Sequence, residues 1–193
     1  MINEKFVVLG ALINLTGTLG YVKNTLNGST RPNRASWIMW TIAPMVAFAA
    51  QISEGVGLRS LVTFMAGFGP LLILVASFVN RKSVWRLTKF DIICGVLSFL
   101  GLCLWAITKQ GNLAILLAIV ADLFAAIPTL KKSYHDPESE SSFAYITAAV
   151  SGGITLLTIK NWTFATWGFP LYIVLICLAL SFLIVYKPSV KAK

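Results

Sequence analysis

The sequence predicts an all-α membrane protein with seven transmembrane helices, arranged as two three-helix repeats in parallel orientation on either side of a linker helix. Three observations predict this fold class. Hydrophobic residues make up 57% of the 193 residues and charged residues only 12%, which is more apolar surface than a soluble domain of this size can bury. A short phrase recurs one hundred residues further along the chain. Lys and Arg alternate in number from one loop to the next.

Seven stretches are long and apolar enough to cross about 30 Å of hydrocarbon at about 1.5 Å per residue. The tail Met1 to Lys5 has no basic region and no cleavage motif, so we expect the first stretch to be the insertion signal itself. The last stretch carries no charge at all. In chain order, the expected spans are 6–22, 35–53, 60–80, 90–108, 113–130, 142–159 and 164–186.

The loop charges predict how the chain is oriented. Of the 16 Lys and Arg residues, twelve fall on one side of the expected spans and four on the other. The positive-inside rule then places the N-terminus outside and the C-terminus in the cytoplasm. We expect a multi-pass protein of the plasma (inner) membrane. Because the net charge of +9 is spread over membrane flanks, lipid headgroups are the expected partner and nucleic acid is not.

The two halves of the chain repeat each other around the expected linker. An odd number of helices between two three-helix units gives both units the same orientation. The units are 1–82 and 111–193, with the linker helix at 83–110. The repeated phrase consists of Thr63-Phe64, Pro70-Leu71 and Ile73, which recur as Thr163-Phe164, Pro170-Leu171 and Ile173. Weaker alignments pair Ser36 with Ser142, Asn14 with Asp122, and Gly20 with Pro128.

Asp122 is the main candidate for a functional side chain, because it is the one ionisable residue well inside an expected span. A charged Asp at the centre of a helix costs about 2.5–3.5 kcal/mol on insertion scales, so such residues face a cavity or a partner. Apolar surroundings favour the neutral acid, which makes Asp122 a candidate for carrying a proton or contacting a solute. The alternative is a structural hydrogen bond to Asn14, its repeat mate.

Aromatic residues and prolines supply the other candidates. Trp40 aligns close to Tyr145, so the two could line one cavity from opposite sides, and Trp167 lies at a similar depth. Lipid or helix contact is the alternative for each. Prolines inside spans kink helices and either shape the packing or act as hinges. The candidate hinge positions are Gly20, Pro70, Pro128 and Pro170.

Several other polar and aromatic residues favour ordinary structural roles. Trp37 lies near the end of a span and suggests the interfacial belt, while Gln51 is expected to be solvated. The acidic segment 134–140 favours a solvated loop. The alternative is a gate that pairs Asp136 or Glu138 with a basic residue, and the basic candidates are Lys131, Lys132 and Arg34.

The sequence predicts neither a metal site nor a cofactor, and we expect the protein not to be an enzyme. The three cysteines lie inside spans without metal-ligand spacing, and the single histidine, His135, falls on a loop. The zinc-protease pattern HExxH, an acyl-transfer triad and a phosphate-binding glycine loop do not occur in the sequence.

The end of the fifth span resembles the PQ-loop motif. It reads Ala126-Ile127-Pro128-Thr129-Leu130-Lys131-Lys132, and a short polar loop then leads to Glu140-Ser141-Ser142. This is similar to the Pro-Gln pair, basic residue and Ser-containing helix entry of SWEET and SemiSWEET sugar transporters and of lysosomal PQ-loop amino-acid exporters. Those exporters place an acidic residue on the same helix, as Asp122 is placed here. The resemblance implies a small-solute transporter that works by alternating access.

The departures from the motif indicate a diverged branch. Thr129 replaces the Gln, and the stretches that follow Pro70 and Pro170 lack the asparagine of SWEET sugar sites. We therefore expect a transporter of a small polar or aromatic solute, with proton coupling through Asp122 as one mode, and it could be a homo-oligomer. One alternative is a SWEET-like sugar facilitator without proton coupling. Another is a PQ-loop-like membrane receptor or sorting protein without transport.

Overall fold

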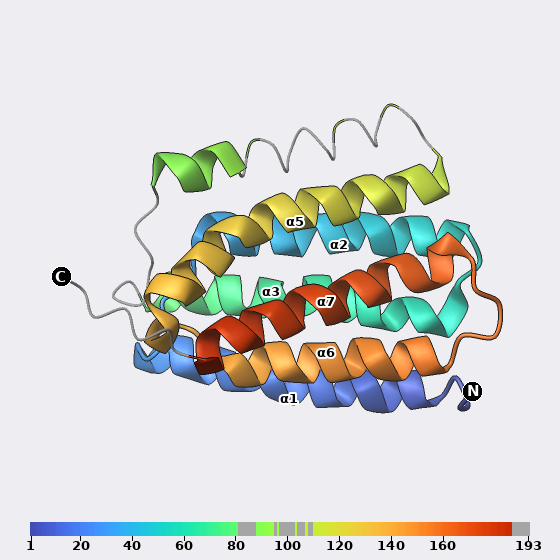
Figure 1. Cartoon of the computed structure of the whole chain (residues 1–193), viewed down its shortest axis with the longest axis horizontal. Coiled ribbons are helices and arrows are strands. Elements are labelled where there is room, and N and C mark those ends of the chain that lie inside the picture. The colour runs from blue at the N-terminus through green and yellow to red at the C-terminus, as the bar shows by residue number, and fades with distance from the viewer. Residues whose placement is uncertain (81–87, 95, 97–102, 104–106, 108–109, 187–193) are drawn as a thin grey trace.

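The computed structural model describes residues 1–80, 88–94, 96, 103, 107 and 110–186. This part of the chain is helical and contains no strand, so the all-α prediction is confirmed. Figure 1 shows the long helices side by side in an elongated bundle. These helices are α1 (Phe6–Asn27), α2 (Arg34–Ser53), α3 (Leu61–Val79), α5 (Gly111–His135), α6 (Ser142–Leu157) and α7 (Phe164–Tyr186).

Five segments are long and apolar enough to cross a membrane, which indicates a multi-pass membrane protein. They are α1, α2, α5, α7 and the stretch Gly57–Val79, in which a short 3₁₀ turn leads into α3. Helix α6 is apolar but has only 16 residues, about 24 Å at the usual rise. The predicted linker span 90–108 begins in a helical segment at 89–94, and most of it lies outside the described residues.

The surface of the bundle is apolar and its interior contains many polar side chains. Large hydrophobic residues such as Leu12, Leu123 and Leu175 are exposed in mid-helix. Asn14, Thr63 and Asp122 are buried. A soluble protein would not leave so much contiguous apolar surface in water, whereas a bilayer provides a solvent for it.

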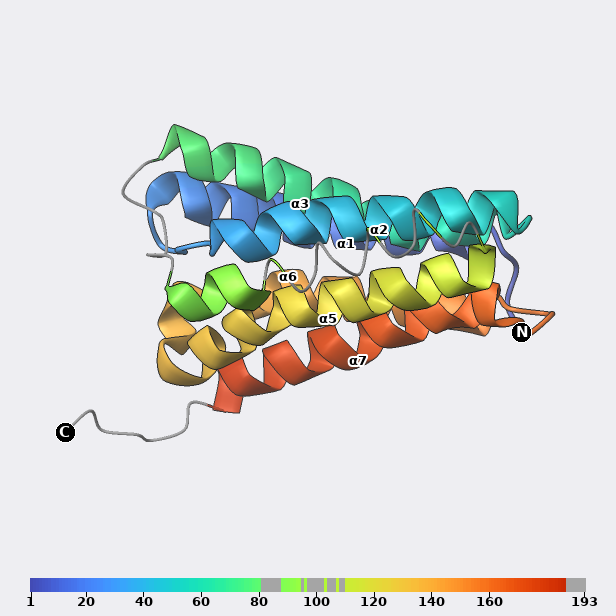
Figure 2. The same ribbon diagram turned by 90° about the horizontal axis from the view of Figure 1, so that it is seen from above.

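The helices form two layers. Figure 2 shows α1, α2 and α3 in one layer and α5, α6 and α7 in the other. Within the layers, α3 packs against both α1 and α2, and α7 packs against both α5 and α6. The main contacts between the layers join α1 to α6 and α2 to α5. Each layer is therefore continuous with the other along two seams.

Small residues allow the helices to approach closely at both seams. A Cβ atom added to Gly17 of α1 would lie 1.9 Å from Thr147 Oγ1 and 3.0 Å from Ala144 Cα, both on α6. On the other seam, Ala118 and Ala125 of α5 are completely or almost completely buried. Small residues at such positions are typical of helix contacts inside membranes.

Helices α1 and α5 extend beyond the apolar spans 6–22 and 113–130, because a helix can continue into polar sequence at the membrane surface. Helix α1 ends where Gly28 adopts a left-handed conformation (φ 83°) and donates its N–H to Thr25 O. Helix α5 runs past Pro128 to His135 without interruption. Asn33 begins α2 by accepting a hydrogen bond from the N–H of Ala35 at 3.1 Å.

Candidate functional site

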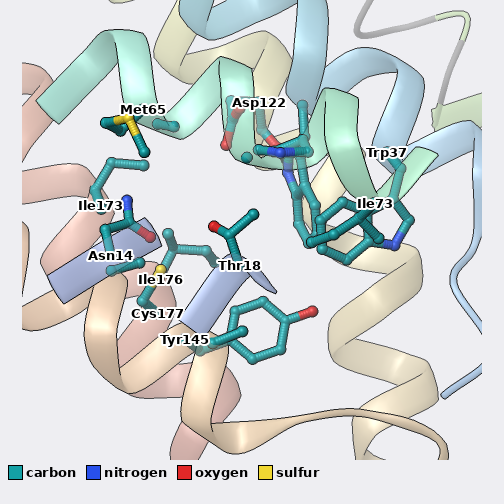
Figure 3. Close-up of a pocket in the computed structure, with 16 residues that line it drawn as sticks. Asn14, Thr18, Trp37, Met65, Ile73, Asp122, Tyr145, Ile173, Ile176 and Cys177 are labelled. Atoms are coloured by element: carbon teal, nitrogen blue, oxygen red, sulfur yellow. Dashed lines mark hydrogen bonds between the residues drawn. The ribbon is translucent and has the colours of Figure 1, made fainter. Parts of the chain in front are cut away.

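A cavity lies between the two layers, and all six long helices contribute to its wall. The cavity has a volume of about 80 Å³ and is partly open to the surroundings. Figure 3 shows side chains from both layers around this space. The wall is mainly aliphatic, and its polar and aromatic members come from four helices. These members are Asn14, Thr18, Trp37, Trp40, Asp122 and Tyr145.

Asp122 is held in place on α5 and keeps one oxygen available. Its side chain is 3% exposed, and its Oδ2 accepts a hydrogen bond of 2.6 Å from the hydroxyl of Tyr172 on α7. Its Oδ1 has no hydrogen-bond partner among the described residues. Trp40 on α2 donates its indole N–H to the backbone oxygen of Asp122 at 3.3 Å. A buried acceptor without a partner is costly, so this oxygen is suited to receiving a ligand or a proton.

The predicted repeat mates Asn14 and Asp122 line the same cavity from opposite layers. The structure shows no hydrogen bond between them, and Tyr172 is the partner of the carboxylate instead. Sequence reasoning missed Tyr172, since one tyrosine in an apolar span carries no signal of its own. Tyr172 is the partner because it lies on α7, which packs against α5 within the same layer.

An aromatic wall lies on one side of the cavity. Trp37 and Trp40 have ring centroids 5.1 Å apart, and Trp40 lies 6.4 Å from Tyr145. The placement of Trp37 at the lipid interface is wrong, because its side chain is only 3% exposed and packs against Tyr21 at 4.9 Å. Trp37 therefore points into the bundle, where it lines the cavity.

Trp167 is not among the residues that line the cavity and packs against Phe164 at 5.4 Å. Helix α7 contributes Ile173, Ile176 and Cys177 instead. Among the candidate hinges, Pro70 lies on the cavity wall. Pro128 and Pro170 are buried inside continuous helices, while Gly20 lies near Phe143 across the α1–α6 seam.

A buried ionic cluster joins the two layers at the end where α1 and α5 finish. Lys132 and Glu140 form an ion pair of 2.6 Å, with their side chains 1% and 0% exposed. The hydroxyls of Tyr21 and Tyr145 donate to Glu140 Oε2 at 2.7 and 3.0 Å. Lys132 also donates to the backbone oxygen of Arg31. We call Tyr21, Arg31, Lys132, Glu140 and Tyr145 the end cluster.

The end cluster corrects the expectation of a solvated loop over 134–140. Its outer part is exposed or half-buried, with Asp136 paired to Arg31 at 2.5 Å, but Glu140 is buried. Gln51 is also buried, contrary to expectation, and donates its amide N–H to Ala165 O at 2.8 Å. Both residues lie at helix ends, where the sequence pattern suggests solvent but a neighbouring helix covers the side chain.

Among the residues that the structure describes, no three His, Cys, Asp or Glu side chains come together as a metal site would require. Asp122 is the one charged residue in the cavity wall, and that wall contains no Lys, Arg or His. The arrangement can therefore hold a small solute at a carboxylate against aromatic rings. Comparison with protein-family models, curated proteins and solved structures found no match for the chain.

Proposed function

We propose that the protein is a carrier that moves a small solute across a membrane by alternating access. The observation that supports this best is the cavity between the two layers, where the buried carboxylate Asp122 has one oxygen without a partner. An ionisable residue inside a membrane helix is by default a candidate for part of a solute or proton pathway. The site also lies between two sets of helices that could rock against each other.

The pattern of helix contacts supports a duplicated architecture of the PQ-loop and SWEET-like kind. The helices of the two layers correspond in order, α1 to α5, α2 to α6 and α3 to α7. Each main contact between two helices has a counterpart between the two corresponding helices. In both layers the third helix packs between the first two. Such a pattern is expected of two parallel repeats related by an axis along the membrane normal, with the linker helix between them.

The end cluster is the natural barrier at one end of the cavity. Tyr145 belongs both to the cavity wall and to the cluster, so opening this end requires the bonds to Glu140 to separate. By the loop charges this end faces the cytoplasm. We propose that the helices bend during opening at four positions, namely Gly20, Pro70, Pro128 and Pro170.

Asp122 offers a route to proton coupling. A charge inside the membrane is costly, so the carboxylate gains from binding either a proton or a cationic group. The carrier would then exchange one for the other at a single oxygen atom. Tyr172 would hold the other oxygen through the cycle.

The test is uptake into proteoliposomes of purified protein, with and without an imposed pH gradient, for sugars, amino acids, vitamins and amines. We expect at least one solute to accumulate and the gradient to change its rate. Asp122→Asn is expected to lose the response to the gradient, whereas Glu54→Gln, which removes an exposed carboxylate outside the cavity and away from the end cluster, keeps it. Gradient-dependent uptake by Asp122→Asn would rule out proton coupling through Asp122, and no uptake of any solute would contradict the carrier.

A further inference from the structure

We infer that the cavity selects small lipophilic organic cations, whose ammonium group binds the free oxygen of Asp122 while the apolar body lies against the aromatic wall. The inference rests on the proposed function, since it names the class of solute for the same site. It depends on three features of the wall, namely its charge, its aromatic rings and the state of the two carboxylate oxygens.

The charge of the wall favours a cation and disfavours an acid. Asp122 is the only charged group in the lining. Three basic residues at the end of the bundle that carries the end cluster already have partners. Lys132 pairs with Glu140 within the cluster, Lys131 lies over the ring of Phe90 at 5.0 Å, and Arg34 donates to Ser77. The carboxylate of an amino acid or of an organic acid would enter without a cationic partner, and burial of an unpaired charge is strongly unfavourable.

The aromatic and aliphatic residues favour a lipophilic body. Trp37, Trp40 and Tyr145 form a continuous series of rings along the wall, and an ammonium group near such rings gains from the cation–π interaction. The polar groups beyond Asp122 are few: Asn14 and Thr18 on α1 are the main ones that reach the cavity. A sugar, with a hydroxyl on nearly every carbon, would find too few partners there.

A proton is the one competitor of the ammonium group for Oδ1 of Asp122, given the groups that surround this carboxylate. The titratable groups that interact with it are Tyr172 and Cys177, both on α7. From α2 it meets the indole N–H of Trp40, and α1 presents Asn14 and Thr18, none of which titrates. The lining residues of α3 and α6 carry no group of opposite charge. A proton on Oδ1 removes the charge that an ammonium needs, so acid should weaken binding of the cation.

The test measures equilibrium binding to detergent-purified protein by tryptophan fluorescence and calorimetry. The probes are 2-phenylethylamine, its neutral isostere 2-phenylethanol, and the anion 3-phenylpropanoate. At pH 8 we expect the amine to bind at least about tenfold more tightly than the alcohol, and the anion to show no binding. The advantage of the amine should shrink as the pH falls towards 5.

The matched variants are Asp122→Asn and Glu54→Gln, which remove one negative charge inside and outside the cavity. Asp122→Asn should lose the preference for the amine while the alcohol still binds, which also shows that the variant is folded. Glu54→Gln should keep the wild-type preference. Equal affinity for amine and alcohol in the wild type, or an amine preference that survives Asp122→Asn, would overturn the inference. If Asp122→Asn does not fold, the wild-type comparison across pH decides alone.

This binding assay separates the inference from the proposed function. Selective binding of the amine without flux in proteoliposomes would support the cation site and contradict the carrier. Flux of sugars or neutral solutes, without a preference for the amine, would support the carrier and overturn the cation site.

Discussion

At the scale of single residues, the most informative feature is that two carboxylates are buried in different ways. Glu140 is fully satisfied, since Lys132, Tyr21 and Tyr145 all donate to it. Asp122 is satisfied at one oxygen only. A buried carboxylate with all its hydrogen bonds made is typical of a structural role. A buried carboxylate with one oxygen unpartnered is typical of a binding site without its ligand.

Removing the charge of Glu140 should therefore destabilise the protein. Glu140→Gln leaves the ammonium of Lys132 buried without its counter-ion, and breaking such a pair costs about 3–5 kcal/mol. The measurement is thermal unfolding in detergent, with Glu138→Gln as the control at an exposed position two residues away.

The double variant Glu140→Gln with Lys132→Met sharpens this prediction. Because it removes both charges, it should recover a large part of the lost stability. Equal stability of Glu140→Gln and Glu138→Gln would show that the end cluster does not hold the layers together.

At the scale of the helices, close approach along the seams decides how the layers meet. Gly17 on α1 leaves no room for a Cβ atom, because Ala144 Cα and the side chain of Thr147 lie against it. Gly153 on α6 has nothing within 4 Å of the equivalent position. The two glycines have the same intrinsic helix propensity but opposite packing.

We predict that Gly17→Ala destabilises the bundle and Gly153→Ala does not. The added methyl at position 17 must push α1 away from α6, and overpacking of this kind costs about 1–3 kcal/mol. At position 153 the substitution should be neutral or slightly stabilising. Unfolding of both variants in mixed micelles measures the difference, and a stable Gly17→Ala would mean that the α1–α6 seam is looser than the structure indicates.

At the scale of the whole molecule, the apolar surface indicates a bundle embedded in a membrane, and the loop charges predict its orientation there. The loop between α1 and α2 lies at the end with the end cluster, while the loop between α6 and α7 lies at the opposite end. The first loop carries Arg31, beside Arg34 at the start of α2, and the second carries Lys160. The orientation proposed from this difference has the N-terminus outside.

Labelling of single cysteines tests this orientation. In a background without the three native cysteines, Asn161→Cys should react with a membrane-impermeant maleimide in intact cells. Ser29→Cys should react only after permeabilisation. Both positions are exposed and uncharged, so the change itself does not alter the loop charge. Reversed labelling would invert the topology, and labelling of both from outside would contradict a membrane-spanning bundle.

The cavity could be predicted from the sequence only in part. Burial cost and the repeat alignment indicate four residues, and all four line the cavity: Asn14, Trp40, Asp122 and Tyr145. Trp167 was named by depth alone and lies elsewhere, because depth along a helix does not determine the direction of a side chain around it. Trp37 was placed at the lipid surface for the same reason.

Composition and the long apolar runs are sufficient to predict that this chain is helical and apolar, with one carboxylate deep inside a span. In lipid, backbone N–H and C=O groups find hydrogen-bond partners only within the helix, so an apolar chain of this kind is expected to be helical. A charge inside a span is costly and rare, so Asp122 is easily recognised in the sequence. The bond from Tyr172 to Asp122 and the burial of Glu140 against Lys132 depend on how the helices pack. Helices that are apolar on nearly every face do not reveal which side meets a neighbour, so these partners appear only once the layers are packed.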